Sequence, residues 1–334
     1  MTIKDIARES GYAVGTVSRV LNHHPGVSEE ARARVLEVVE KYHFQLNSNA
    51  KHLKQQAGNG IAIIIKGRQN MLFNSIVEQM QGLIKQKGFA CLIYYIDEDE
   101  NELDQALLVC RERRPLGILF LGSNQEYFVK RFSEIAIPCI LVTNSAASLG
   151  YPNLSSVGTD DTEAAKTAVT YLFSLGHKYI GILGGNTEIS HAASARFKGC
   201  LQAFEEKGVS FQKEHQYVTA RFSMSDGYHA MEQLLDQMPE LTVVFAMSDV
   251  MAVGAIRAIR ERGLRVPEDI SVMGFDGIEL GRYMTPQLTT IRQHKELIAA
   301  RSVEILLDCI MEEKNAVHEI TPFHLIPGES VAKA

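Results

Sequence analysis

The chain has 334 residues, of which 46% are hydrophobic, so it can bury a large core and is long enough for more than one domain. Its formal net charge of −6 at pH 7 argues against a protein that coats nucleic acid with its whole surface. The charge is uneven, because residues 1–56 hold eight Lys and Arg against six Asp and Glu, whereas the remaining residues hold 26 against 34. A mildly basic head on an acidic body is typical of a protein that touches DNA with one end only.

The first 45 residues predict three short helices. Thr2 is a suitable N-cap for the first helix, which ends at Gly11. The second helix follows directly, and its apolar face is formed by Val14, Val17, Val20 and Leu21. Two short helices joined by a turn that contains Gly form a helix-turn-helix, whose second helix enters the major groove of DNA. Ser28 is placed to cap the third helix.

A polar connector follows from His43 to Asn59. Within it, residues 49–54 are long enough for about one and a half helical turns. A helix of this length is unstable on its own. From these residues alone, a flexible linker with an incidental leucine, Leu53, is the simpler interpretation.

From Gly60 onward the chain alternates short apolar strands with helices. A first series of strands is predicted at residues 61–65, 91–95, 116–121 and 139–142, and a second series at residues 179–183, 242–246 and 270–275. Alternation at this spacing requires right-handed crossovers and gives doubly wound parallel sheets. Two such series in one chain predict an α/β fold of two lobes that face each other.

Polar residues at the ends of the predicted strands are candidates for a binding site. Ligands of open α/β sheets bind beyond the carboxyl ends of the strands, and the residues at or near such positions are Lys66, Asn144, Asp160, Arg196, Ser248, Asp249 and Asp276. Carboxylates accept hydrogen bonds from neighbouring hydroxyl groups, and an arginine donates a fork of them. Phe73 and Phe222 can supply apolar walls. A structural role remains open for each, since Ser248 suits a helix N-cap and Asp276 suits a turn.

Motifs along almost the whole chain occur in a characteristic order. They lie at residues 2–7, 11, 16–22 and 27–28 in the head, and at residues 157–160, 176–180, 196–199, 266–272, 274–276 and 288–291 in the body. Together they resemble the LacI/GalR family of bacterial transcription regulators. The family's regulatory domain is similar to periplasmic sugar-binding proteins, which agrees with the two predicted lobes.

The resemblance implies a domain organisation. Residues 1–45 would form the helix-turn-helix headpiece, residues 46–57 a hinge helix or linker, and residues 60–334 the effector-binding and dimerisation domain. The N-lobe would hold about residues 60–158 and 292–321, and the C-lobe about residues 159–290 and 322–334. The chain would then cross between the lobes near residues 158, 290 and 321.

The same resemblance assigns roles to individual residues. On the second helix, the base edges would be read by Val14, Gly15 and Arg19, and the phosphates would be contacted by Thr16, Ser18 and Asn22. Leu53 would wedge between base pairs in the minor groove. The effector, a sugar or sugar derivative, would contact Phe73, Asp160, Arg196, Phe222, Ser248, Asp276 and Gln293. The implied partners are double-stranded operator DNA, this effector and a second copy of the chain in a homodimer, with no cofactor or metal and no membrane.

Several positions depart from the family pattern. The hinge has Leu46 where the family usually has Pro and Lys51 where it usually has Arg, and Ser248 replaces an Asn. Lys66 and Arg68 place two cations after the first strand, which would suit a phosphorylated or acidic effector. A purine is a further alternative to a sugar.

Two other classes of protein compete with a regulator. An enzyme is disfavoured because the chain contains no P-loop, GxGxxG, HExxH or GxSxG motif. A stand-alone sugar-binding protein would share the two lobes but would need export, and charged residues interrupt any signal peptide at Lys4, Asp5, Arg8 and Glu9. Five widely spaced cysteines also suit free thiols in a reducing compartment. We therefore expect a cytoplasmic, effector-controlled repressor of carbohydrate-utilisation genes rather than an enzyme.

Overall fold

The structure is a computed structural model that describes residues 3–21, 26–42, 60–312 and 314–334. The chain forms two compact units, residues 1–57 and residues 58–334. Three predictions lie outside the described residues: the Thr2 cap, the phosphate contact Asn22, and the hinge at residues 46–57 with Leu53.

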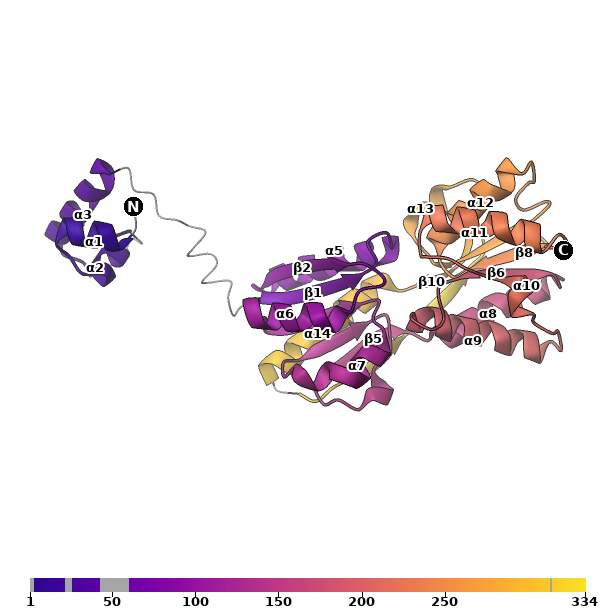
Figure 1. Cartoon of the computed structure of the whole chain (residues 1–334), viewed down its shortest axis with the longest axis horizontal. Coiled ribbons are helices and arrows are strands. Elements are labelled where there is room, and N and C mark those ends of the chain that lie inside the picture. The colour runs from indigo at the N-terminus through magenta and orange to yellow at the C-terminus, as the bar shows by residue number, and fades with distance from the viewer. Residues whose placement is uncertain (1–2, 22–25, 43–59, 313) are drawn as a thin grey trace. The chain divides into compact units, whose positions relative to one another are not determined.

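The first unit contains the three expected helices, α1 (Ile3–Ser10), α2 (Val14–Leu21) and α3 (Glu29–Lys41) (Figure 1). Their apolar faces meet in a small core of Ile6, Ala7, Val17, Val20, Val35 and Val38. The prediction of the third helix cap is confirmed, since Ser28 Oγ accepts a hydrogen bond of 3.3 Å from the backbone N–H of Ala31. The prediction that Val14 belongs to the packed face of α2 is wrong, because Val14 is 41% exposed.

The N-lobe of the second unit is built on a six-stranded sheet with the order β11-β5-β4-β3-β1-β2, in which every pairing is parallel. The strands are β1 (Gly60–Lys66), β2 (Ala90–Ile96), β3 (Gly117–Leu121), β4 (Cys139–Val142), β5 (Leu154–Thr159) and β11 (His318–Thr321). Strand β1 is buried along its whole length, as its unbroken apolar run predicts.

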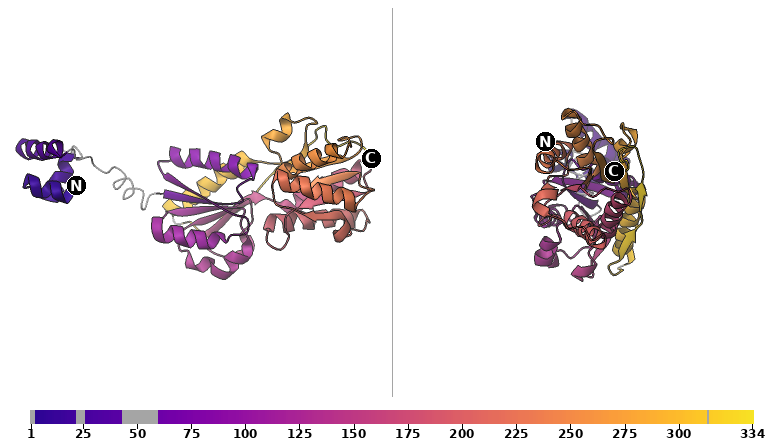
Figure 2. Two further views of the ribbon diagram at one scale, coloured as in Figure 1. Left: turned by 45° about the horizontal axis from the view of Figure 1, so that its top comes forward. Right: turned by 90° about the vertical axis from the view of Figure 1, so that its right-hand side faces the viewer.

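Helices cover both faces of this sheet (Figure 2). On one face, α5 (Met71–Gln86) and α14 (Lys295–Glu312) pack over Ile61, Ile63 and Ile65. On the other face, α6 (Glu102–Arg113) and α7 (Gln125–Arg131) pack over Ala62 and Ile64, followed by the short helices η1 (Phe132–Glu134) and η2 (Ala147–Leu149). The alternation along β1 divides the lobe into two apolar layers.

The C-lobe repeats this plan with the strand order β12-β10-β9-β8-β6-β7. Its strands are β6 (Ile180–Gly184), β7 (Tyr217–Thr219), β8 (Val243–Ala246), β9 (Ser271–Asp276), β10 (Thr289–Gln293) and β12 (Phe323–Ile326). Only β12 runs antiparallel to its neighbour among these described strands. One face is covered by α8 (Asp161–Ser174) and α9 (His191–Glu206). The other face is covered by α11 (Met224–Gln237) and α12 (Asp249–Glu261). Two further helices, α10 (Lys213–Gln216) and α13 (Glu279–Tyr283), are short. The predicted α/β fold of two parallel-sheet lobes is therefore confirmed.

The chain passes between the sheets after β5, after β10, and between β11 and β12. Strand β10 extends to Gln293 within the C-lobe sheet, three residues beyond the expected crossing at residue 290. In the part of the chain that the structure describes, no helix is long and apolar enough to span a membrane.

Five strands were not predicted: β5, β7, β10, β11 and β12. Strand β5 shows the reason, since Ser155 and Ser156 interrupt its apolar pattern although both are buried. Their hydroxyl groups find partners on the returning chain: Ser155 Oγ accepts from the N–H of Val317 at 3.0 Å, and Ser156 Oγ lies 2.9 Å from His318 Nδ1. Polar residues can thus occupy an interior strand when a segment 162 residues away satisfies them.

Candidate functional sites

Helix α2 presents its polar residues on the surface of the first unit. The five predicted contact residues of this helix are all exposed or half-buried: Val14, Gly15, Thr16, Ser18 and Arg19. Val17 and Val20 point into the core and fix the orientation of the helix. No atom lies within 4 Å of the position that a Cβ at Gly15 would occupy. A surface of this kind lets a helix backbone approach a groove closely.

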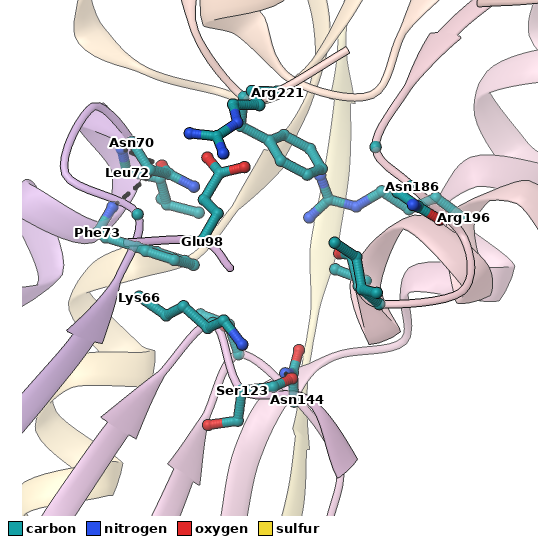
Figure 3. A pocket seen from close by; sticks show the side chains of 18 of the residues that line it. Lys66, Asn70, Leu72, Phe73, Glu98, Ser123, Asn144, Asn186, Arg196 and Arg221 are labelled. Carbon is teal, nitrogen blue, oxygen red and sulfur yellow. Dashed lines mark hydrogen bonds between the residues drawn. The ribbon is translucent and has the colours of Figure 1, made fainter. Parts of the chain in front are cut away.

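The second unit contains a cavity of about 390 Å³ between its lobes, at the carboxyl ends of the strands (Figure 3). This volume lies in the range of small-molecule sites. Five of the seven predicted effector contacts line it: Phe73, Arg196, Phe222, Asp276 and Gln293.

Two glycines make room for the aromatic walls of this cavity. Gly122 has a φ of +78°, and a Cβ there would lie 2.8 Å from the ring of Phe73. A Cβ at Gly185 would lie 2.7 Å from the ring of Phe222. A larger residue at either position would displace the ring, so the backbone after β3 and β6 places the two rings.

The remaining two predicted contacts, Asp160 and Ser248, do not line the cavity. Both are helix N-caps: Asp160 Oδ1 accepts from the N–H of Glu163 at 3.0 Å, and Ser248 Oγ accepts from the N–H of Met251 at 3.3 Å. Their side chains are used by α8 and α12, which is the structural role that the sequence left open. The neighbouring Asp161 contacts a cavity residue instead.

Arg196 is held in a buried network on the C-lobe side. Its Nε donates to Asp161 Oδ1 at 2.8 Å, and one terminal nitrogen lies 3.5 Å from Asp276 Oδ1. A further N–H donates to the carbonyl oxygen of Met247, and the guanidinium lies 3.8 Å from the ring centre of Phe275. Arg196 is only 6% exposed, so its charge is neutralised within the protein and its orientation is fixed.

Asp276 faces the cavity in an unusual backbone conformation. Its φ is 113°, a region that side chains other than glycine rarely adopt, and such strain is common at ligand sites. Oδ1 accepts a hydrogen bond of 2.9 Å from Gln293 Nε2. Burial raises the pKa of Asp276 to about 7, against the opposing effects of Arg196 and Gln293.

A second buried carboxylate, Asp249, lies behind Asp276 and outside the cavity lining. It accepts from Thr290 Oγ1 at 2.6 Å and from the N–H of Ile278 at 2.7 Å. Burial and the nearby charge of Asp276 hold its pKa well above the usual range. These bonds connect α12 to the turn after β9 and so support the position of Asp276.

On the N-lobe side, Lys66 lines the cavity but already has a partner. Its Nζ lies 3.0 Å from Glu102 Oε2, and both side chains are buried. The same ammonium group lies 4.9 Å from the ring centre of Tyr127. Arg68, the second cation considered from the sequence, is exposed and does not line the cavity. The sequence did not reveal the Lys66–Glu102 pair because 36 residues separate its members.

Among the cavity-lining residues on this side, two buried polar atoms have no hydrogen-bond partner within the described ranges, Ser123 Oγ and Asn144 Oδ1. Both residues line the cavity, below Lys66 in Figure 3. Asn144 uses its Nδ2 to donate to the carbonyl oxygen of Ser123 at 2.7 Å, which fixes the orientation of its amide. A buried acceptor without a partner is costly, and a ligand that donates hydrogen bonds would satisfy it.

The lobes also contact each other directly around the cavity. Arg221 of the C-lobe lies 3.3 Å from Asp97 Oδ1 and also pairs with Asp99, both in the N-lobe loop after β2. Val250 and Ile278 of the C-lobe pack in the same apolar cluster as Phe73 at the start of α5. No group of three or more His, Cys, Asp or Glu placed to hold a metal ion occurs within the described ranges.

Comparisons with known proteins agree with both units. The family model of bacterial regulatory proteins of the lacI family matches residues 2–47, and the model of a periplasmic binding protein-like domain matches residues 169–331. The transcriptional regulator MalR of Clostridium butyricum is 32% identical over 333 residues, which cover 99% of each chain.

Two solved structures share the fold over 99% of each chain. A lac repressor dimer bound to operator and the anti-inducer ONPF superposes with a TM-score of 0.73 at 24% identity. A complex of the transcriptional regulator CelR with cellobiose superposes with a TM-score of 0.70 at 23% identity.

Proposed function

This chain belongs to the LacI family of bacterial regulatory proteins, and we propose that it represses carbohydrate-utilisation genes under the control of a neutral saccharide bound between its lobes. The family is one of transcriptional regulators, in which the first unit carries the helix-turn-helix. The presence of this unit argues against a stand-alone sugar-binding protein.

The proposal of a neutral saccharide rests chiefly on which charged and polar groups of the cavity already have partners. The two buried cations that line it, Lys66 and Arg196, are paired with Glu102 and Asp161. Unfilled acceptors remain, including Asn144 Oδ1. A ligand that donates many hydrogen bonds can satisfy these acceptors. A phosphate offers only further acceptors and would need cations that Glu102 and Asp161 already neutralise.

The aromatic rings complete the fit. Phe73 and Phe222 line the same cavity as the polar groups. A sugar ring has apolar C–H faces and a hydroxyl periphery, so it can pack on the rings while its hydroxyl groups reach the polar groups. The CelR complex, a fold relative, holds a saccharide.

For DNA, we propose that a homodimer reads a two-fold operator. Helix α2 would enter the major groove with Val14, Gly15 and Arg19 toward the base edges, and with Thr16, Ser18 and Asn22 toward phosphates. Leu53 would wedge into the minor groove from a hinge that forms on DNA. Ligand binding would change the relation of the lobes and so the population of dimers competent for DNA.

Thermal shift assays on the full chain test the effector. The panel contains neutral saccharides, the corresponding sugar phosphates, and purines. A ligand at about 100 times its dissociation constant adds about 2.7 kcal/mol to the free energy of unfolding. We expect neutral saccharides to raise the melting temperature and sugar phosphates not to. The reverse ranking would refute a neutral effector.

Selection of binding sites from random DNA, followed by fluorescence anisotropy with and without the saccharide found, tests the regulator. We expect a two-fold symmetric site and an affinity that changes on addition of the saccharide. Equal affinity for every sequence at physiological salt would refute sequence-specific recognition.

A further inference from the structure

The cavity extends well beyond the network around Arg196. The cavity volume is about 390 Å³. A single ring held by the C-lobe groups would leave the polar groups of the N-lobe, Ser123 and Asn144, without a ligand.

The N-lobe half contains its own hydrogen-bonding groups. Ser123 and Asn144 are 3% and 4% exposed, and each has one polar atom that no described residue satisfies. Glu98, which also lines the cavity, is a third group without a hydrogen-bond partner among the described residues. The three groups are a hydroxyl, an amide oxygen and a carboxylate, and none is a cation. They call for a ligand that donates hydrogen bonds.

Glu98 is the third of these groups. It lines the cavity, half-buried, and its side chain packs 3.4 Å from the position that a Cβ at Gly67 would take. Figure 3 shows its carboxylate beside Arg221, between that residue and Phe73. No described residue forms a hydrogen bond or ion pair with it, because Arg221 is engaged by Asp97 and Asp99. Burial raises the pKa of Glu98 above its usual value, and the charge of Arg221 acts against this effect.

We propose, resting on the saccharide effector argued above, that the cavity holds two sugar rings and that Glu98 determines specificity for the second ring. The first ring lies against Arg196, Asp276 and Gln293 of the C-lobe. The second ring donates hydroxyl groups to Glu98 and Asn144 of the N-lobe. The effector is thus a neutral disaccharide, and each lobe recognises one of its rings.

Isothermal titration calorimetry on the full chain tests this assignment. The monosaccharides glucose, galactose and fructose are compared with the disaccharides maltose, cellobiose, trehalose, lactose and sucrose, which span α and β linkages. We expect at least one disaccharide to bind about tenfold or more tightly than any monosaccharide, since hydrogen bonds to a charged group contribute more than those between neutral groups.

The variant Glu98→Gln removes the charge and keeps the shape of the side chain. It should weaken the best disaccharide about tenfold and leave the affinity for its component monosaccharide unchanged. Glu112→Gln is the matched control, because Glu112 is exposed on α6 and lies outside the cavity lining. It should bind every sugar as the parent does.

The outcomes separate two failures. If no saccharide binds while a sugar phosphate or purine does, the proposed function itself fails. If a monosaccharide binds as tightly as every disaccharide, the effector is still a saccharide but the two-ring assignment is overturned. Equal weakening of both sugar classes by Glu98→Gln, or of neither, removes Glu98 from the second-ring subsite.

Discussion

Replacing Arg196 by alanine should destabilise the second unit itself. The guanidinium is 6% exposed and is the cation closest to two buried carboxylates, at 2.8 Å from Asp161 and 3.5 Å from Asp276. Removing one member of a buried ion pair costs about 3–5 kcal/mol, because the partner charge stays buried without compensation. The family resemblance alone would suggest a variant that folds normally and ignores its effector, and the burial of this network argues otherwise.

The expected loss can be measured as a melting temperature. In a unit of this size, each kcal/mol shifts the melting temperature by roughly 2–4 °C, so Arg196→Ala should melt about 6–20 °C below the parent. Arg257→Ala is the matched control in the same lobe, because Arg257 is 71% exposed and pairs with Glu261 across one helical turn. An exposed pair of this kind contributes about 0–1 kcal/mol.

The deficit of Arg196→Ala should also depend on pH. Burial raises the pKa of Asp276 to about 7 in the folded protein, so between about pH 4 and pH 7 the folded carboxyl binds a proton that the unfolded one has released. The stability that this proton contributes is present at low pH and is lost as the pH rises through 7. Without Arg196 the pKa rises further, so calorimetry should find a larger deficit at pH 8 than at pH 6. A melting temperature within 2 °C of the parent at pH 8 would refute the reasoning.

Three further predictions concern the lobes and the DNA. Arg221→Gln breaks the ion pair with Asp97 across the cleft, so stopped-flow measurements should show faster release of the saccharide and a weaker dependence of affinity on salt; unchanged release would contradict a closing role. Arg19→Ala should cost about 1–3 kcal/mol of operator affinity and relax the preference at one base pair in each half-site, whereas Ser18→Ala should weaken all sequences alike; selection from random DNA distinguishes these outcomes. Leu53→Ala should abolish most operator affinity and bending while saccharide binding stays intact, and a variant that bends its operator like the parent would favour a plain linker.

The fold was largely predictable because local patterns and packing agree. Residues 61–65 are a continuous apolar run, and the structure buries it between two helical layers. Ser28 precedes two acidic residues and caps α3 as expected. The strands that escaped prediction are those with polar residues or short lengths, such as β7 with three residues and β11, whose Ile320 is 75% exposed. Periodicity cannot identify a strand whose burial depends on distant segments.

The cavity was predictable in part, for a related reason. The carboxyl ends of parallel strands converge, which brought Asp276 and Lys66 into consideration, and both line the cavity. The sequence could not show that Asp161, rather than Asp160, contacts Arg196. A shift of one residue at the start of α8 decides whether a carboxylate caps the helix or binds Arg196. Pairing is likewise a property of the folded chain, so only the structure shows that Lys66 is neutralised by Glu102.

These pairings explain how one cavity can both bind a ligand and connect the lobes. Because Lys66 and Arg196 are already neutralised by Glu102 and Asp161, ligand binding need not break their ion pairs. The ligand can instead satisfy the unpaired polar atoms of Ser123 and Asn144. Phe73 belongs to the cavity wall and also to the apolar cluster shared with Val250 and Ile278 of the other lobe. A ligand that packs on Phe73 therefore acts on a residue of the lobe interface. Only contacts that differ between arrangements of the lobes can shift their equilibrium, and Phe73 and Arg221 are the residues placed to make them.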